Sequence, residues 1–373
     1  MAGQRVWTVE NDYSVLEKYL TERNVRSILL VCGSSFESLT VGKYINECAK
    51  KKGIRLVKFS EFSPNPKYEE VVNGTALLRE EQSDLLMAVG GGSAIDVAKC
   101  MKLYKNLDPS LNYLDQEVVA NSLPFLVIPT TAGTGSEATR FAVIYYHGEK
   151  LSIAHESSIP GIVLLDASVL KSVPEYQRKA TMLDALCHAV ESFWSVHSTE
   201  ESKKYSKQAI CLILENKESY LKNDEAGNKN MLLAANLAGK AINITQTTAG
   251  HAMCYKLTSL YGIAHGHAAA LCVAVLWKYM IQHVEYCIDV RGKQYLKTVF
   301  QELAFVMGGK NIQQGAEIFC GVLHDLKMEI PKVQEEDFVL LKRSVNLVRL
   351  KNNPIHLSEL IIDSLYHRLE SLY

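Results

Sequence analysis

The sequence predicts two domains: an N-terminal α/β domain built on a doubly wound, Rossmann-like parallel sheet, followed by an all-α domain. The chain has 373 residues, of which 47% are hydrophobic, enough for two cores. Over the first 150 residues short β-branched runs alternate with helical stretches, and beyond Pro174 apolar residues take helical spacing. We therefore expect domains at 1–177 and 178–373.

The strands of the first domain are expected in short apolar runs, SILLVCG, IRLVKFSEF and DLLMAVGGG. PFLVIPTTAGTGSEAT adds a buried strand and a loop of small residues, and GIVLLDASVL adds the last strand. FAVIYYHGEKLSIAHE predicts an antiparallel hairpin that turns at Gly148. In the second domain, helices are expected in ATMLDALCHAVESFW, KNMLLAANLAGKAIN and EIFCGVLHDLKM.

Charge and targeting features narrow the class of protein. With 40 basic and 41 acidic residues the net charge is -1, so nucleic acid and membrane surfaces are poor partners. The opening segment lacks the layout of a signal peptide, and the longest apolar run, AAALCVAVLW, is too short to cross a bilayer. None of the nine cysteines forms a Cys-x-x-Cys pair. We expect a cytoplasmic protein with reduced cysteines.

A glycine-rich turn suggests phosphate binding. AVGGGSAIDVAK follows an apolar strand and opens a helix, so amides near Gly91, Gly92 and Ser93 can face a phosphate at the positive end of the helix dipole. Asp96 in the same motif is a further candidate. A plain tight turn between strand and helix is an equally good explanation of this motif alone.

A second loop favours phosphate binding over a plain turn. PTTAGTGSEAT places Thr130, Thr131 and Thr134 among glycines after another strand. Two loops at the carboxyl edge of one doubly wound sheet can flank a single dinucleotide. We expect NADPH or NADH to bind there.

The strand SILLVCG ends without the acid that many NAD-binding folds use to hold the ribose hydroxyls. Gly33 and Ser34 stand in that place. We expect NADPH to be accepted at least as well as NADH, unless an acid is supplied from elsewhere.

Four residues of the second domain form a candidate metal site. Asp184 and His188 lie four apart on a predicted helix and share one face, although such a pair is often accidental. His251 and His265 can converge on the same point through a helix, a turn and the next helix start. One carboxylate and three imidazoles suit Fe(II) or Zn(II), and an open position would make the ion a Lewis acid.

In this order, GGGSAID, PTTAGTGSE, ATMLDALCHAVE and GHAM…AHG resemble the iron-dependent (group III) alcohol dehydrogenases over nearly the whole chain. The resemblance implies a cofactor in a cleft between two domains and the four metal ligands named above. It also implies that Asn65, in SPNP, and Lys150, in the hairpin, approach the dinucleotide.

The chain departs from the family where many members carry a second histidine four residues after the one matching His251. Tyr255 stands there. An unperturbed tyrosine pKa near 10 makes it a poorer proton shuttle than imidazole. His267 is the alternative relay, and Tyr255 could equally serve only as packing while solvent supplies the proton.

Two cations flank the motifs, Arg140 after SEAT and Lys256 after Tyr255. A cation facing a substrate site favours an anion, whereas most such residues are solvated surface groups. GTGSEATRFAVIYY and HAMCYKLTSLYGIAHGH resemble the branch containing phosphonoacetaldehyde reductases. We expect a metal-dependent NAD(P)H oxidoreductase that interconverts a small aldehyde and its primary alcohol, with phosphonoacetaldehyde and 2-hydroxyethylphosphonate as the specific pair.

Three alternatives remain. They are a general short-chain alcohol dehydrogenase, a lyase of the dehydroquinate synthase type, which regenerates its dinucleotide in each turnover, and a nucleotide-binding protein without chemistry. The intact ligand set argues against the last. Beyond its small-molecule substrate, the expected partner is a second copy of the chain in a homodimer.

Overall fold

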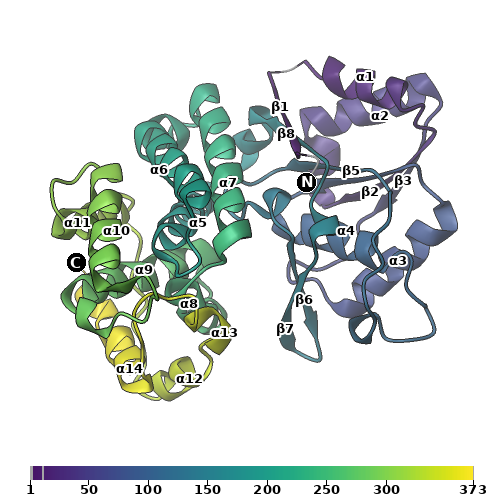
Figure 1. The fold of residues 1–373 in the computed structure, drawn as a ribbon. Helices are drawn as coiled ribbons and strands as arrows, with labels where there is room; N and C mark the ends of the chain where they lie inside the picture. Colours follow the sequence, from purple (N-terminus) through teal and green to yellow (C-terminus); the bar gives the residue numbers. More distant parts are fainter. Residues whose placement is uncertain (1–2, 11, 373) are drawn as a thin grey trace. The chain divides into compact units, whose positions relative to one another are not determined.

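The structure is a computed structural model that describes residues 3–10 and 12–372 (Figure 1). The chain divides into two compact units. The first runs to Val173 and also contains Asn223–Leu232, and the second holds Pro174–Lys222 and the residues from Leu233 onward. The division at Val173 lies near the boundary expected at 177. The sequence pattern did not predict that helix α7 (Glu225–Thr245) would be shared between the units.

The first unit contains a six-stranded sheet whose strand pairs are all parallel, in the order β1-β8-β5-β4-β2-β3. The strands are β1 (Arg5–Val9), β2 (Ser27–Cys32), β3 (Arg55–Phe59), β4 (Leu85–Gly90), β5 (Phe125–Pro129) and β8 (Ile162–Asp166). The edge strand β1 was not expected from the sequence. The α/β-plus-helical fold class is confirmed.

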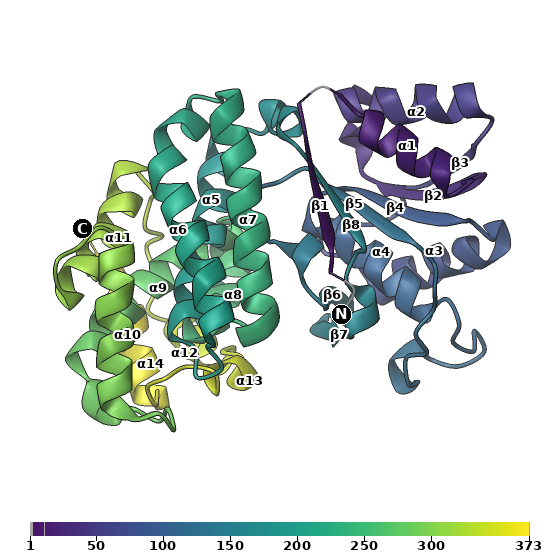
Figure 2. The ribbon, with the colours of Figure 1, turned by 45° about the horizontal axis from the view of Figure 1, so that its top comes forward.

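Helices cover both faces of this sheet. In Figures 1 and 2, α1 and α2 lie on one face and α3 and α4 on the other. These helices are α1 (Ser14–Glu22), α2 (Thr40–Lys52), α3 (Tyr68–Glu81) and α4 (Gly92–Tyr104). Alternate residues of the central strands, such as Leu29 and Val31 of β2 and Leu86 and Ala88 of β4, join the core under α3 and α4. This is why these strands read as continuous apolar runs.

The strand order places a reversal point between β2 and β4. From β2 the chain goes outward to β3, whereas from β4 it goes to β5 on the opposite side. Cys32 at the end of β2 pairs with Val89, and Gly90 at the end of β4 pairs with Pro129. The loops after β2, β4 and β5 therefore leave the same edge of the sheet, where open α/β sheets bind their ligands.

The expected hairpin is present. β6 (Phe141–Tyr146) and β7 (Glu149–Ala154) pair antiparallel, with His147 and Gly148 both at positive φ in the turn. Positive φ at both central residues is typical of the two-residue turns that match strand twist. The hairpin packs on α4 and α3 through β6.

The second unit is helical. Its helices are α5 (Glu175–Trp194), α6 (Glu200–Leu221), α8 (Ala249–Tyr261), α9 (His265–Gln282), α10 (Gly292–Val306), α11 (Ile312–Asp325), α12 (Asp337–Arg343), α13 (Leu347–Leu350) and α14 (Glu359–His367). α5 packs against both α6 and α9, and α9 packs against α8. Trp194 of α5 and Trp277 of α9 meet edge to face, with ring centroids 5.4 Å apart.

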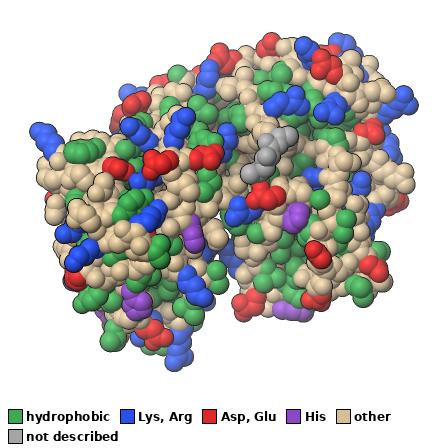
Figure 3. Space-filling model, in the orientation of Figure 1, with side chains coloured by type: hydrophobic (Ala, Val, Ile, Leu, Met, Phe, Trp, Pro, Cys, Tyr) green, Lys and Arg blue, Asp and Glu red, His purple; other side chains and the backbone are tan. Residues whose placement is uncertain are grey.

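Short 3-10 helices complete the described chain: η1 (Ser34–Ser38), η2 (Tyr113–Asp115), η3 (Ser136–Ala138), η4 (Glu156–Ser158), η5 (Ala167–Ser172), η6 (Val284–Tyr286) and η7 (Leu369–Ser371). Among the residues that the structure describes, no helix combines the length and apolarity needed to cross a membrane. On the face seen in Figure 3, cationic and anionic side chains are interspersed.

The contact between α5 and α9 depends on Gly266. A Cβ at this position would lie 2.0 Å from the Ala180 carbonyl oxygen and 2.6 Å from the Asp184 Cβ. Neither group can move without moving α5. Glycine therefore lets the start of α9 approach the middle of α5.

We expect Gly266→Ala to lower the free energy of unfolding by at least about 2 kcal/mol, because overpacking here must shift a helix backbone. Gly321→Ala is the matched control, since it lies within α11 and a methyl group there would have no neighbouring atom within 4 Å. Alanine there should be neutral or stabilising by up to about 1 kcal/mol. Urea unfolding followed by circular dichroism measures both, and equal stabilities would contradict the close approach.

Candidate metal centre and cofactor loops

Three helices of the second unit carry the four predicted metal ligands. Asp184 and His188 lie one turn apart on α5, His251 lies in the first turn of α8, and His265 is the first residue of α9. The close packing at Gly266 brings the start of α9 to α5. The structure thus brings all four side chains together.

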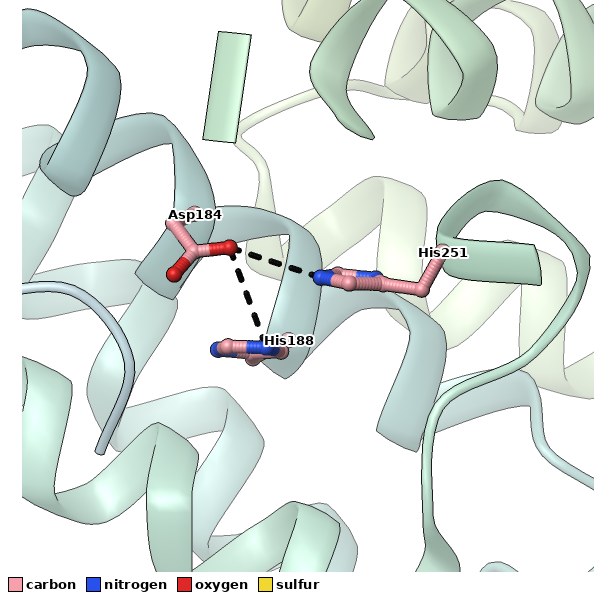
Figure 4. Close-up of side chains that lie close together, drawn as sticks. All are labelled: Asp184, His188 and His251. Atoms are coloured by element: carbon pink, nitrogen blue, oxygen red, sulfur yellow. Dashed lines mark hydrogen bonds and ion pairs between the residues drawn. The ribbon is translucent and has the colours of Figure 1, made fainter. Parts of the chain in front are cut away.

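The three histidine rings converge on one carboxylate oxygen of Asp184. The Asp184 Oδ1 atom lies 3.4 Å from the His251 Nε2, 3.8 Å from the His188 Nε2 and 3.9 Å from the His265 Nε2. Figure 4 shows Asp184, His188 and His251, with both rings directed toward the same carboxylate oxygen. Asp184, His188 and His251 alone already form a compact group of possible metal ligands.

These separations fit a shared ion better than hydrogen bonds. Good N–H···O bonds span about 2.7–3.2 Å, shorter than all three distances. In a tetrahedral site with bonds of about 2.0–2.1 Å, neighbouring ligand atoms stand about 3.3–3.4 Å apart. A carboxylate oxygen and three imidazole nitrogens also match the donor set that Fe(II) and Zn(II) accept. The residues fit a divalent metal, with a modest contraction around it.

Access to the cluster is uneven. The side chains of Asp184, His188 and His251 are at most 7% exposed, whereas that of His265 is 37% exposed. A small molecule can therefore reach the cluster on the His265 side. An open coordination position on this side would let a substrate oxygen bind the metal.

The charges around the cluster favour a cation. Burial alone would raise the pKa of Asp184, but the neighbouring His188, His251 and His265 hold it below its usual range. Burial lowers the pKa of His188 to about 4, so its ring is neutral near pH 7. Its Nδ1 has no hydrogen-bond partner among the described residues.

Glu191 supports His251 from behind. Its Oε2 accepts the hydrogen bond of the His251 Nδ1, and its Oε1 accepts bonds from the Thr248 backbone N (3.1 Å) and hydroxyl (2.6 Å). When a metal displaces the Nε2 proton, the Nδ1–H bond would leave the Nε2 lone pair directed at the cluster. Burial opposes both charges, yet the mutual attraction of the pair raises the pKa of His251 and lowers that of Glu191.

Glu191 was not predicted from the sequence, although a signal was present. Asp184, His188 and Glu191 follow the i, i+4, i+7 spacing of one helix face. Glu191 thus adds a second buried carboxylate to the site, which favours a cation there.

Two further residues contact His265. The Tyr255 ring stacks on it with centroids 5.5 Å apart and planes within 9°, and the Cys254 Sγ lies 3.5 Å from its Nδ1. Burial raises the pKa of Tyr255, so its hydroxyl stays protonated at neutral pH. Tyr255 is therefore close to the candidate site, and its role in proton transfer stays a prediction.

His267 faces elsewhere. Two residues along a helix turn a side chain by about 200°, and the His267 Nδ1 lies 3.1 Å from the Tyr176 hydroxyl, which accepts the Ala264 backbone N–H at 2.9 Å. Both residues line a cavity of about 520 Å³ together with residues 326–329. The hydrogen bond and the ring contact of the His267 side chain are thus made with Tyr176 rather than with the four ligands.

The first unit gathers the candidate dinucleotide residues around the start of α4. Gly91 is the N-cap of this helix, and Gly92 and Ser93 form its first turn. A Cβ on Gly91 would lie 3.4 Å from Thr131, and one on Gly92 would lie 3.2 Å from Thr134. The two predicted loops are therefore in contact, and side chains larger than glycine would fill the space between them.

The second loop is tied to the end of β4 and to α4 by hydrogen bonds. The Thr130 N–H donates to the Gly90 carbonyl at 3.0 Å, and the Ser136 hydroxyl donates to Asp96 at 2.6 Å. Asp96 also accepts the Val143 N–H at 2.9 Å. Its carboxylate thus already serves the loop and the hairpin, and direct contact with a dinucleotide remains a prediction.

The remaining cofactor candidates lie around the same edge of the sheet. The Ser93 hydroxyl bonds to the Pro64 carbonyl, next to the exposed Asn65. Lys150 is exposed opposite Tyr145 in the hairpin, and the Tyr145 N–H donates to the Pro66 carbonyl at 2.8 Å. After β2 come Gly33 and the exposed Ser34.

The two cations predicted to bind an anion differ in their surroundings. Arg140 pairs with Glu156 at 3.1 Å and lies over the Phe141 ring. Lys256 lies on α8, partly buried beside Tyr255. Arg140 is thus already partly neutralised, which weakens its case as the primary anion ligand.

Known proteins share this arrangement of sequence and fold. Residues 4–167 match the family described as iron-containing alcohol dehydrogenase, and residues 179–367 match the C-terminal part of the same family. Alcohol dehydrogenase 4 of Saccharomyces cerevisiae is 28% identical over 87% of this chain and 85% of its own. Phosphonoacetaldehyde reductase of Streptomyces viridochromogenes is 32% identical over 62% of each chain.

A solved structure has the same fold. The sulfoacetaldehyde reductase of Bifidobacterium kashiwanohense, crystallised with NAD+, superposes with a TM-score of 0.86. The match covers 99% of this chain and 97% of the other, at 24% identity. At this identity the likeness establishes the fold alone.

We expect Glu191→Gln to weaken metal binding by about 10- to 100-fold, because the charge that orients and polarises His251 is lost. Competition with a chromophoric chelator measures the apparent Kd for Zn(II). Glu175→Gln, at the exposed start of the same helix, should leave that Kd unchanged. Equal affinities for wild type and Glu191→Gln would show that Glu191 does not support the metal.

Proposed function

The chain belongs to the iron-containing alcohol dehydrogenase family, and from this premise we propose that it reduces a small anionic aldehyde to its primary alcohol with NADPH. Membership makes it an NAD(P)-dependent oxidoreductase of aldehydes and alcohols. The observation that carries the proposal is the buried set of Asp184, His188 and His251 beside the partly exposed His265.

Each bound group would have a defined task. A divalent iron or zinc ion at the four ligands would supply Lewis-acid polarisation of a carbonyl, and NAD(P)H would supply the hydride. The chain's own residues orient these groups. Glu191 fixes the His251 tautomer, and the start of α4 offers backbone N–H groups and a helix dipole to phosphates.

Proton delivery is assigned to residues beside His265. Tyr255 stacks on that ring and keeps its phenolic proton at neutral pH, so it can donate a hydrogen bond to a substrate oxygen. This supports Tyr255 over His267, whose ring is bonded to Tyr176. Solvent entering past the exposed edge of His265 would return the proton afterwards.

The second part of the proposal is that the substrate is an anion. The relative named phosphonoacetaldehyde reductase supports it, as does Lys256 on the helix that carries His251. The specific reaction proposed is phosphonoacetaldehyde to 2-hydroxyethylphosphonate. A general short-chain alcohol dehydrogenase is the competing function, and a lyase is disfavoured by family membership. The proposal includes a cytoplasmic homodimer, whose mass light scattering would measure.

We expect kcat/KM with NADPH to equal or exceed that with NADH. The turn after β2 presents Gly33 and Ser34 rather than a carboxylate that would repel a 2'-phosphate. Initial rates with both cofactors at saturating aldehyde test this. A strong preference for NADH would mean that an acid from another segment reaches the ribose.

The decisive experiment is an NADPH oxidation assay on chelator-treated protein reloaded with Fe(II) or Zn(II). Activity should vanish on chelation and return with metal, and phosphonoacetaldehyde should exceed a neutral aldehyde of similar size by about tenfold or more in kcat/KM. Equal kcat/KM values for the two aldehydes would rule out the preference for an anionic substrate, but the protein would still be a metal-dependent dehydrogenase. Turnover without net NADPH consumption would instead indicate the lyase.

A further inference from the structure

Arg349 belongs to a short segment that is fastened beside the metal centre. It lies on α13, which packs on α8. The Asn346 N–H donates to the Ala252 carbonyl at 3.3 Å, and the Asn352 side chain donates to the Thr247 carbonyl at 3.0 Å. Both acceptors flank His251 in the sequence, so this segment is anchored at the turn that carries a metal ligand.

The guanidinium of Arg349 forms no ion pair with an acid among the described residues. Its Nη1 donates to the Thr247 hydroxyl, and no carboxylate pairs with it anywhere in residues 3–10 and 12–372. Other arginines differ: Arg55 pairs with Glu81, and Arg291 pairs with Asp289. A partly buried guanidinium with most of its five N–H donors unused is suited to an anion.

The guanidinium is anchored next to the hydrogen bonds that support the metal centre. Its partner Thr247 precedes Thr248, whose backbone N and hydroxyl donate to Glu191, and Glu191 accepts the Nδ1 bond of His251. Tyr255 lies one turn further along α8 than His251 and stacks on His265, the accessible ligand.

We propose that Arg349 is the residue that binds the acid group of the substrate while the aldehyde end approaches the metal centre on the His265 side. The inference rests on the proposed function and names its substrate class: a short aldehyde bearing a phosphonate, sulfonate or carboxylate. A guanidinium can hold two oxygens of such a group in parallel hydrogen bonds. Arg349 thereby takes the place expected of Arg140 from the sequence, with Lys256 as a second cation.

The specificity of this site follows from its charge. A neutral aldehyde would leave the guanidinium solvated and unpaired and would gain nothing from it. The loss on substitution should therefore depend on the substrate. A residue that only holds α13 on α8 would affect all substrates alike.

The test compares wild type with Arg349→Gln, which keeps an N–H donor for Thr247 but removes the charge. We expect kcat/KM for phosphonoacetaldehyde to fall by about 10- to 100-fold. The value for propanal should stay within about threefold, and the melting temperature should be unchanged. Arg343→Gln, an exposed arginine of α12, is the matched control and should change neither substrate.

An equal loss for both aldehydes would assign Arg349 a structural role and overturn the proposal. A second measurement separates it from the proposed function: calorimetric binding of methylphosphonate to the zinc-loaded protein. Wild type should bind this unreactive anion at least tenfold more tightly than Arg349→Gln, even if no aldehyde is reduced. Equal affinity, or no binding by wild type, would also overturn the proposal.

Discussion

The second unit is organised around the buried carboxylate of Asp184. Removing such a charge from water costs several kcal/mol unless opposite charges or good hydrogen bonds compensate. Here three imidazole nitrogens surround one carboxylate oxygen at 3.4–3.9 Å, too far for strong hydrogen bonds. A divalent cation is the compensation that this geometry fits. The packing of α5, α8 and α9, including the close approach at Gly266, serves to bring these groups to one point.

One face of α5 supplies two metal ligands and also the carboxylate that supports a third ligand. Asp184, His188 and Glu191 lie on successive turns of α5, so the same face that holds the cation also holds the carboxylate behind His251. This coupling makes the His251 tautomer depend on α5 rather than on α8 alone. The accessible ligand, His265, comes from a different helix and is the first residue of α9.

Local spacing in the sequence predicts part of this architecture. The i, i+4 pair, the glycine turn before α4 and the apolar strands β2, β4 and β5 all follow from short patterns, and the strands were confirmed. The edge strand β1 was missed because RVWTV is short and mixes polar with apolar residues. Arg349 could not be found this way, since only tertiary packing sets α13 against the turn that precedes His251. His267 bonds to Tyr176 although it is close to His265 in sequence, because residues two apart on a helix do not share a direction.

The central claim is that Asp184, His188, His251 and His265 bind one metal ion together. The most direct measurement is anomalous diffraction at the zinc edge from crystals of the zinc-loaded protein. We predict a single strong peak bound by an Asp184 oxygen and the Nε2 atoms of the three histidines at about 2.0–2.2 Å, with a further position open beside His265. A peak bound by other residues, or one that lacks His265 or Asp184, would contradict this claim.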